Sequence, residues 1–194
     1  MIFSPPVVHP LTDLKVVLLS GLSDPSDCAL SRTQQRFLDQ IAAPGESKIY
    51  ANFPYIKPVR DEQAAIPIIP ASWRNLSQFL KARHSPYRDQ AVRHWEALVQ
   101  SCRRLLVITI SCGLEILNAA LSTGIRPEVL DILALGPVAR CRPDASHLLV
   151  RGSRDYVVNP FFREVDLIVR DIGHMDYLNH PVILELANKR LQMM

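Results

Sequence analysis

Three residues of this chain have side chains that could together carry out nucleophilic catalysis. Ser111, Asp155 and His174 each follow an apolar run of residues. A serine hydroxyl is a poor nucleophile until a base accepts its proton, and an imidazole titrates near neutrality. An aspartate can hold that imidazole in the correct tautomer and stabilise it when it is protonated. The three residue types therefore predict acyl-transfer chemistry, provided that the fold brings them together.

Apolar runs and helical spacing predict the elements that must position these side chains. Short apolar runs predict strands, and apolar residues at helical spacing predict helices between them. The alternation implies a mostly parallel, doubly wound sheet of about six strands with helices on both faces, and functional groups gather beyond the carboxyl ends of such strands. The predicted strands are 16–19, 48–56, 105–110, 129–135, 147–150 and 165–169, and the predicted helices are about 31–41, 87–103, 114–121 and 181–191.

Ser111 lies between a predicted strand and a predicted helix. A sharp turn there would project its hydroxyl at the edge of the sheet, above the N-terminus of the helix. The segment Thr109-Ile110-Ser111-Cys112-Gly113 resembles the G-x-S-x-G nucleophile elbow of the α/β-hydrolase family, with Thr109 in place of the first glycine. A β-branched residue makes this tight turn tighter. Taken alone, the motif also fits a serine that caps an ordinary helix.

Two further motifs resemble the same family. Asp155 follows a strand in the pattern G-x-x-D, where the family has its acid, and His174 follows a glycine after the last predicted strand, where the family has its histidine. The chain order Ser, Asp, His is also that of the family. The resemblance extends from about residue 15 to the C-terminus. It implies an α/β-hydrolase fold with Ser111 as nucleophile, His174 as base and Asp155 as the acid that orients it.

The resemblance also implies an oxyanion hole and a substrate site. The backbone N–H groups of Cys112 and Leu22 are the expected oxyanion donors. Gly21 would let the backbone approach the substrate, or would be a simple turn glycine.

The irregular stretch of about residues 60–86 is expected to be a small cap-like insertion within a single domain, 1–194. Trp73, Phe79 and Leu80 would line an acyl pocket from it or pack beneath it. So short an insertion argues against the large lid of a typical lipase.

Other residues compete for these roles. Asp131 is an alternative acid, but it lies inside a predicted strand. His180 is an alternative base, but it precedes a proline at a helix entry. Asp171 and Asp176 flank His174 and are expected to be surface or capping residues. Cys112 could be a nucleophile, although only Ser111 lies at the centre of the motif.

Composition limits the classes of partner. The 194 residues include 48% hydrophobic and 21% charged residues, and the net charge is +3, with basic residues scattered among acidic ones. An ordinary globular protein is therefore expected, with no nucleic acid or membrane as partner. The four cysteines form no CxxC pair, so neither a metal nor a disulfide framework is expected. We expect a cytoplasmic protein, because the start of the chain lacks a leader pattern, and we expect no cofactor.

The favoured hypothesis is a serine hydrolase that acts on a small-molecule ester or thioester, free or carrier-bound, through an acyl-enzyme. An amidase or peptidase would use the same three residues. A non-catalytic binding protein of the same fold is the alternative that Thr109 makes credible.

Overall fold

The computed structural model describes residues 7–21, 28–52 and 87–194. In these residues six strands form one parallel sheet with the order β2-β1-β3-β4-β5-β6. This confirms the predicted parallel architecture. The strands are β1 (Thr12–Ser20), β2 (Lys48–Ile49), β3 (Cys102–Ile110), β4 (Val129–Leu135), β5 (Ser146–Gly152) and β6 (Leu167–Val169).

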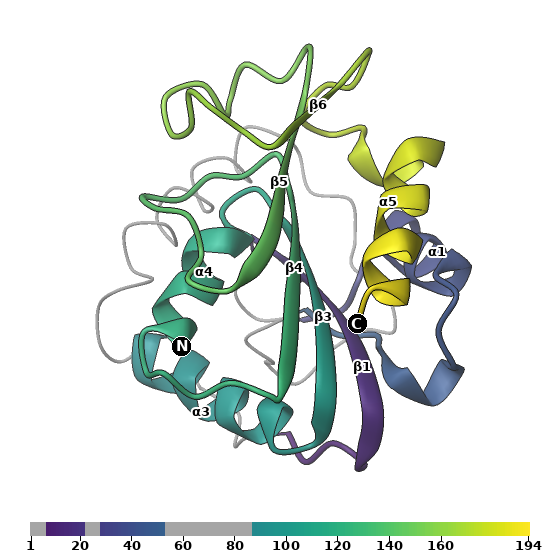
Figure 1. Cartoon of the computed structure of the whole chain (residues 1–194), viewed down its shortest axis with the longest axis vertical. Coiled ribbons are helices and arrows are strands. Elements are labelled where there is room, and N and C mark those ends of the chain that lie inside the picture. Colours follow the sequence, from purple (N-terminus) through teal and green to yellow (C-terminus); the bar gives the residue numbers. More distant parts are fainter. Residues whose placement is uncertain (1–6, 22–27, 53–86) are drawn as a thin grey trace.

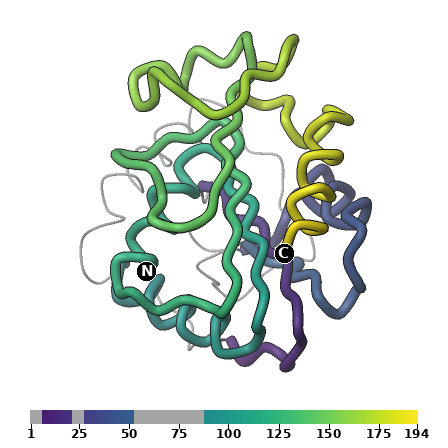
Figure 2. The backbone as a smooth tube through the Cα atoms, viewed as in Figure 1, coloured from purple at the N-terminus to yellow at the C-terminus, as the bar shows by residue number. Residues whose placement is uncertain are grey.

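Helices cover both faces of the sheet, as the alternating pattern predicts (Figure 1). Helices α3 (Tyr87–Val99) and α4 (Gly113–Leu121) lie on one face, and α1 (Arg32–Gln40) and α5 (Pro181–Gln192) lie on the other. Figure 2 shows the backbone of β3 running beside that of β1, a strand far from it in the sequence. Since β2 pairs with one side of β1 and β3 pairs with its other side, the sheet grows in two directions from β1.

The core consists of two apolar layers, one on each face of the sheet. Side chains alternate along a strand, so Leu105 and Val107 of β3 pack toward Trp95 of α3, in the layer that α4 completes. The intervening Leu106 and Ile108 belong to the opposite layer, with residues of α1 and α5. Because both faces are covered, the central strands are almost continuously apolar, which explains why their sequences are so easily identified as strands.

Three elements are shorter than their sequence patterns suggest. Strand β2 ends at Ile49, and the described residues 50–52 do not continue it as the sequence pattern predicts. The side chain of Asn52, and not a strand backbone, accepts the N–H and donates to the carbonyl of Ser20. Helix α3 ends at Val99 because Cys102 already belongs to β3. Strand β6 begins only at Leu167, because the Leu149 N–H of β5 donates to the side-chain carboxylate of Asp166 and not to a backbone carbonyl.

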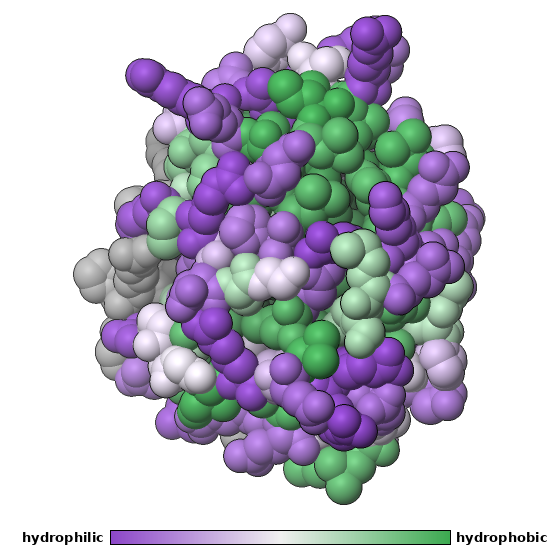
Figure 3. Space-filling view, in the orientation of Figure 1, coloured by the Kyte–Doolittle hydropathy of each residue, from purple (hydrophilic) through white to green (hydrophobic). Residues whose placement is uncertain are grey.

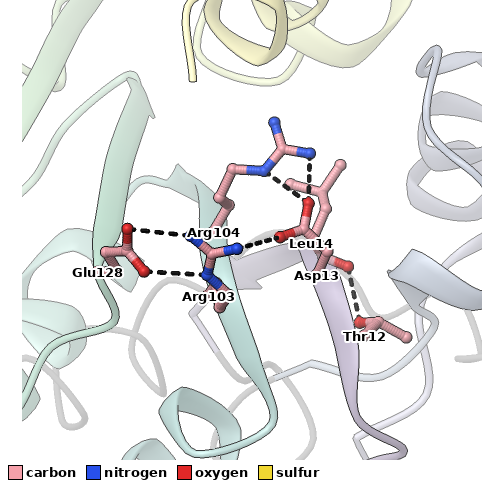
Figure 4. Close-up of polar contacts among 6 residues, drawn as sticks. All are labelled: Thr12, Asp13, Leu14, Arg103, Arg104 and Glu128. Carbon is pink, nitrogen blue, oxygen red and sulfur yellow. Dashed lines mark hydrogen bonds and ion pairs between the residues drawn. The ribbon is translucent and has the colours of Figure 1, made fainter.

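The amino ends of β1 and β3 carry charged pairs rather than functional groups (Figure 4). Asp13 accepts hydrogen bonds from Arg104 at 2.6 and 2.9 Å, and Arg103 pairs with Glu128 at 3.0 Å. The Asp13, Arg103 and Glu128 side chains are all more than half exposed. This edge of the sheet is opposite the edge at which Ser111 lies.

Several sequence predictions fall outside the described residues: the insertion of residues 60–86, Trp73, Phe79, Leu80 and Leu22. In the portion of the chain that the structure describes, no helix is both long and apolar enough to cross a bilayer. No group of three or more His, Cys, Asp or Glu side chains in that portion is arranged to hold a metal ion.

Candidate active site

Ser111 occupies a strained turn between β3 and α4. Its φ of 54° lies in the left-handed region, which costs a non-glycine residue roughly 1–2 kcal/mol. Two backbone hydrogen bonds hold it there: the Ser111 N–H donates to Leu135 O at 3.0 Å, and its carbonyl accepts from the Val138 N–H at 3.1 Å. The turn is thus fixed by the end of β4, and it projects the serine side chain from the carboxyl edge of the sheet.

The local sequence explains why the chain turns at this point. Gly113 begins α4 so close to β1 that a Cβ there would lie 2.2 Å from the carbonyl oxygen of Leu19. Only a glycine allows this approach of helix to strand. The N-cap of α4 is Cys112, which makes no side-chain capping bond, so the interpretation of Ser111 as an ordinary helix cap is wrong.

Thr109 stands where the family motif has its first glycine. It is fully buried between Leu19 of β1 and Ala134 of β4. Its hydroxyl makes no hydrogen bond with any described residue. The sheet therefore accommodates a threonine next to the strained turn at Ser111, but within the described part of the chain it leaves the threonine hydroxyl unsatisfied.

His174 lies between Ser111 and Asp155. Its Nε2 is 3.1 Å from the Ser111 Oγ, and its Nδ1 is 2.8 Å from Asp155 Oδ2. A carboxylate can only accept, so Nδ1 carries the ring proton and Nε2 is free to accept the proton of the serine. The structure thus brings together three residues that are 63 and 19 positions apart in the sequence.

The carboxylate of Asp155 has three hydrogen-bond donors. Its side chain is fully buried, and burial by itself would raise its pKa. Hydrogen bonds from His174, from the Tyr177 hydroxyl and from the Val157 N–H outweigh this and hold the pKa below its ordinary value. Asp155 is therefore ionised at neutral pH, as the orienting partner of an imidazole must be.

Two residues beside this cluster escaped the sequence analysis. Tyr177 donates to Asp155 Oδ2 at 2.6 Å, and Gly136, which follows β4 with a φ of 54°, lies against the same groups. The single available signal was position: Gly136 directly follows the apolar run of β4, and Tyr177 lies three residues after His174. Neither feature distinguishes them from ordinary turn or core residues.

The other expected site residues are placed only in part. Gly21 follows β1, whose last residue pairs with Ile110, so it lies beside the turn at Ser111. Cys112 is buried directly after Ser111. Leu22, the second expected oxyanion donor, is not among the described residues, and neither are the three expected pocket residues of the insertion.

The alternative acids have other partners, and the alternative base lies at the start of α5. Asp131 is buried near the opposite end of β4, where it pairs with Arg190 and accepts from Ser146. Asp171 pairs with Arg154 at the surface, and Asp176 accepts the Gly173 N–H. His180 is the N-cap of α5.

Cys112 is also a poor alternative nucleophile. Its side chain is buried, and that burial, together with the nearby charge of Glu115, raises the pKa of the thiol to about 12. A thiol nucleophile must be ionised, so this one is inactive at neutral pH. The residue that faces His174 is Ser111.

The fold is shared with solved structures of low sequence identity. Protein TT1662 from Thermus thermophilus is similar with a TM-score of 0.55 and 15% identity, over 96% of this chain and 90% of that one. Esterase PE8 matches with a TM-score of 0.49 and 19% identity over 97% and 95% of the two chains. A lidless α/β serine hydrolase, XC6422 from Xanthomonas campestris, matches with a TM-score of 0.41 and 13% identity over 96% and 84%.

No family model and no curated protein sequence matches the chain. Its strand order and the strand-turn-helix at Ser111 are those of the predicted α/β-hydrolase fold, and the likeness to the Thermus protein extends over nearly the whole chain.

Proposed function

We propose that this protein is a serine hydrolase that cleaves an ester or thioester through an acyl-enzyme on Ser111. One observation carries the proposal: an unbroken chain of hydrogen bonds runs from the Ser111 hydroxyl through His174 to the buried carboxylate of Asp155. The strained backbone of Ser111 supports it, because strain of this kind persists where the surrounding structure holds a functional side chain in place.

In the acylation step, the Ser111 Oγ attacks the substrate carbonyl while His174 Nε2 accepts the hydroxyl proton. The new C–O bond gives a tetrahedral oxyanion, and collapse of that intermediate expels the alcohol or thiol, which takes the proton from His174. Asp155 keeps its negative charge throughout and stabilises the protonated imidazole that forms between these two events.

In the deacylation step, His174 accepts a proton from water as the water attacks the acyl-Ser111 ester. The second tetrahedral intermediate then releases the carboxylic acid, and Ser111 recovers its proton. The Cys112 N–H, which follows the nucleophile, is the proposed oxyanion donor from α4, and the Leu22 N–H is the proposed second donor. Gly21 would allow the substrate to approach between them.

Exposed apolar side chains next to the catalytic loops support an acyl substrate. Met175 adjoins His174 and is 74% exposed, and Val157, two residues after Asp155, is 47% exposed. Figure 3 shows hydrophobic surface over β6 and the start of α5. Trp73, Phe79 and Leu80 are the residues we propose for an acyl pocket. The substrate we propose is a small-molecule or carrier-bound acyl ester or thioester, and the proposed compartment is the cytoplasm.

The proposal is tested with a fluorophosphonate probe, which reacts with an activated serine. The folded wild-type protein should be labelled, and peptide mapping should find the probe on Ser111. Ser111→Ala should lose labelling and reduce ester turnover by several orders of magnitude. The matched control is Ser122→Ala, at the end of the same helix, which should be labelled as the wild type is.

Coupling between the residues provides a stricter test. His174→Ala should cost about as much turnover as Ser111→Ala, and the double variant should be little worse than either, because the residues act as one unit. Asp155→Asn should cost on the order of 10⁴-fold by favouring the wrong imidazole tautomer. If the losses of turnover in the single variants multiplied in the double variant, the proposal would be contradicted.

A folded protein that the probe does not label would favour a non-catalytic binding protein, and turnover of amides in preference to esters would favour an amidase.

A further inference from the structure

The Tyr177 hydroxyl is buried at the centre of a small hydrogen-bond network behind His174. Tyr177 belongs to the short 3-10 helix η2 (Tyr177–Asn179) and is 1% exposed. Its hydroxyl donates to Asp155 Oδ2 at 2.6 Å, the same oxygen that faces His174 Nδ1, and it accepts the Gly152 N–H at 2.8 Å. It therefore connects the end of β5, the acid and the loop after the histidine.

The direction of these bonds is fixed by chemistry. The backbone N–H of Gly152 can only donate, so it points its hydrogen at the phenolic oxygen. Among the residues that the structure describes, the acceptor of the phenolic proton is the carboxylate of Asp155. Burial, and then the hydrogen bond to Asp155, raise the pKa of Tyr177, so the hydroxyl remains protonated and stays a donor at any pH at which the protein works.

We propose that Tyr177 is a positioning residue for catalysis, which holds Asp155 Oδ2 toward His174 and takes up part of its negative charge. The inference rests on the proposed hydrolase function. The hydroxyl does not face Ser111, so it acts through Asp155 and not on the substrate. By sharing one carboxylate oxygen with the imidazole, it weakens the hold of Asp155 on protonated His174 and favours return of the proton to the leaving group.

Gly136 shows how tightly this arrangement is packed. A Cβ at Gly136 would lie 2.8 Å from the Tyr177 ring, 2.9 Å from Asp155 Oδ2 and 3.2 Å from His174 Nδ1. The backbone after β4 therefore closes over the hydrogen bond between acid and base. With the phenol on one side and Gly136 on another, the carboxylate has little freedom to turn away from His174.

Other charged groups near this network are few in the described part of the chain. Arg151 acts on Tyr177 only through its charge, and the Asp176 carboxylate is engaged by the Gly173 N–H beside His174. Neither is altered by removing the phenolic hydroxyl. Tyr177→Phe therefore removes one donor to Asp155 and the acceptor of the Gly152 N–H, and it retains the ring that packs against Gly136.

The experiment compares Tyr177→Phe with Tyr50→Phe. Tyr50 is a matched control because its hydroxyl also donates to a carboxylate, Asp39, at 2.7 Å, but at the surface. With an ester substrate, Tyr177→Phe should lower kcat roughly 10-fold with little change in KM. The acidic limb of its kcat/KM profile should move to higher pH by roughly half to one unit, because Asp155 then holds protonated His174 more strongly. Tyr50→Phe should match the wild type in both.

The same substitution made in the Asp155→Asn variant separates a positioning role of Tyr177 from a purely structural one. In Asp155→Asn the acid no longer orients the imidazole, so adding Tyr177→Phe should change the turnover by less than about 2-fold. A 10-fold loss in both backgrounds, or a loss of kcat without movement of the pH profile, would overturn the proposal. Thermal unfolding of each variant at the assay pH shows whether the protein compared is folded.

The failure of this inference is distinguishable from the failure of the proposed function. If the fluorophosphonate probe labels Ser111 in the wild type and in Tyr177→Phe at equal rates, the hydrolase proposal stands and the role of Tyr177 is refuted. If the wild type is neither labelled nor active, the hydrolase proposal fails. The NMR titration midpoint of the His174 ring proton then tests whether Tyr177 acts on the Asp155–His174 pair, since it should rise in Tyr177→Phe and be unchanged in Tyr50→Phe.

Discussion

A buried negative charge is the feature of Asp155 on which the proposed chemistry depends. Desolvation would neutralise such a group, but three hydrogen bonds reverse the effect and depress its pKa. Loss of any one of these donors should raise the pKa of Asp155 toward the value that burial favours. The histidine is thus controlled by residues that do not contact a substrate.

The depressed pKa of Asp155 predicts how stability depends on pH. A carboxylate whose folded pKa lies below its ordinary value of 3.8 contributes stability that is present above 3.8. That stability is lost as the pH falls through the lower folded value. The free energy of unfolding in urea, measured from pH 6 to pH 2.5, should therefore fall less steeply below pH 3.8 in Asp155→Asn than in the wild type.

The control for this measurement is Asp171→Asn. Asp171 is an exposed carboxylate with a φ of 61°, a conformation that asparagine also tolerates. Its variant should follow the wild-type curve below pH 3.8. Equal curves for wild type and Asp155→Asn would contradict the hydrogen-bonding account of the pKa.

At the scale of the element, the unit β3, Ser111 and α4 sets the position of the nucleophile. Gly113 permits the close contact of α4 with β1, and the end of β4 holds the strained serine by two hydrogen bonds. Thr109 is the exception in this unit, because its buried hydroxyl has no partner among the described residues. The turn therefore accepts a larger side chain than glycine at position 109, but no side chain at Gly113.

Thr109→Val should therefore stabilise the protein. Valine has nearly the same shape as threonine, so the change removes an unsatisfied hydroxyl without creating a cavity, and about 1 kcal/mol or more should be gained. Denaturant unfolding measures this. Thr123→Val is the control, since the Thr123 hydroxyl donates to Ala120 O at 2.9 Å and its loss should destabilise. Destabilisation by Thr109→Val would indicate a partner for the hydroxyl.

At the scale of the whole molecule, the last helix is attached to the sheet by a largely buried ion pair. Arg190 of α5 pairs with Asp131 of β4, and Ser146 of β5 donates to the same carboxylate. The Asp131 side chain is 6% exposed. The chain between β5 and α5 carries both Asp155 and His174, so this attachment restrains a segment on which the site depends.

Two aspartates that each pair with arginine should differ greatly in what their removal costs. Asp131→Ala removes the partner of the largely buried Arg190 and should therefore lower the free energy of unfolding by about 3 kcal/mol or more. Asp13→Ala removes a 54% exposed carboxylate from the pairs in Figure 4 and should cost less than about 1 kcal/mol. Urea unfolding of both variants checks this difference. Comparable losses would mean that burial does not decide the strength of these pairs.

The sequence by itself determined the order and type of the described elements, and the resemblance of its motifs to the α/β-hydrolase family identified Ser111, Asp155 and His174 as a set. It could do so because strands buried on both faces are continuously apolar, and because chemically useful residues of a parallel sheet directly follow its strands. Element ends were less well predicted. Asn52 and Asp166 make side-chain hydrogen bonds to distant backbone near the ends of strands, and no local pattern reveals such bonds.

Only the tertiary structure decided what surrounds the acid. Tyr177 and Gly136 are separated from Asp155 by 22 and 19 positions, and each has an ordinary interpretation in the sequence, as an apolar core residue and a turn glycine. Their role depends on the ends of β4 and β5 and the loop after β6 meeting at one point. That meeting is set by packing of the whole sheet and its helices, because hydrogen bonds across such distances form only once the chain has folded around them.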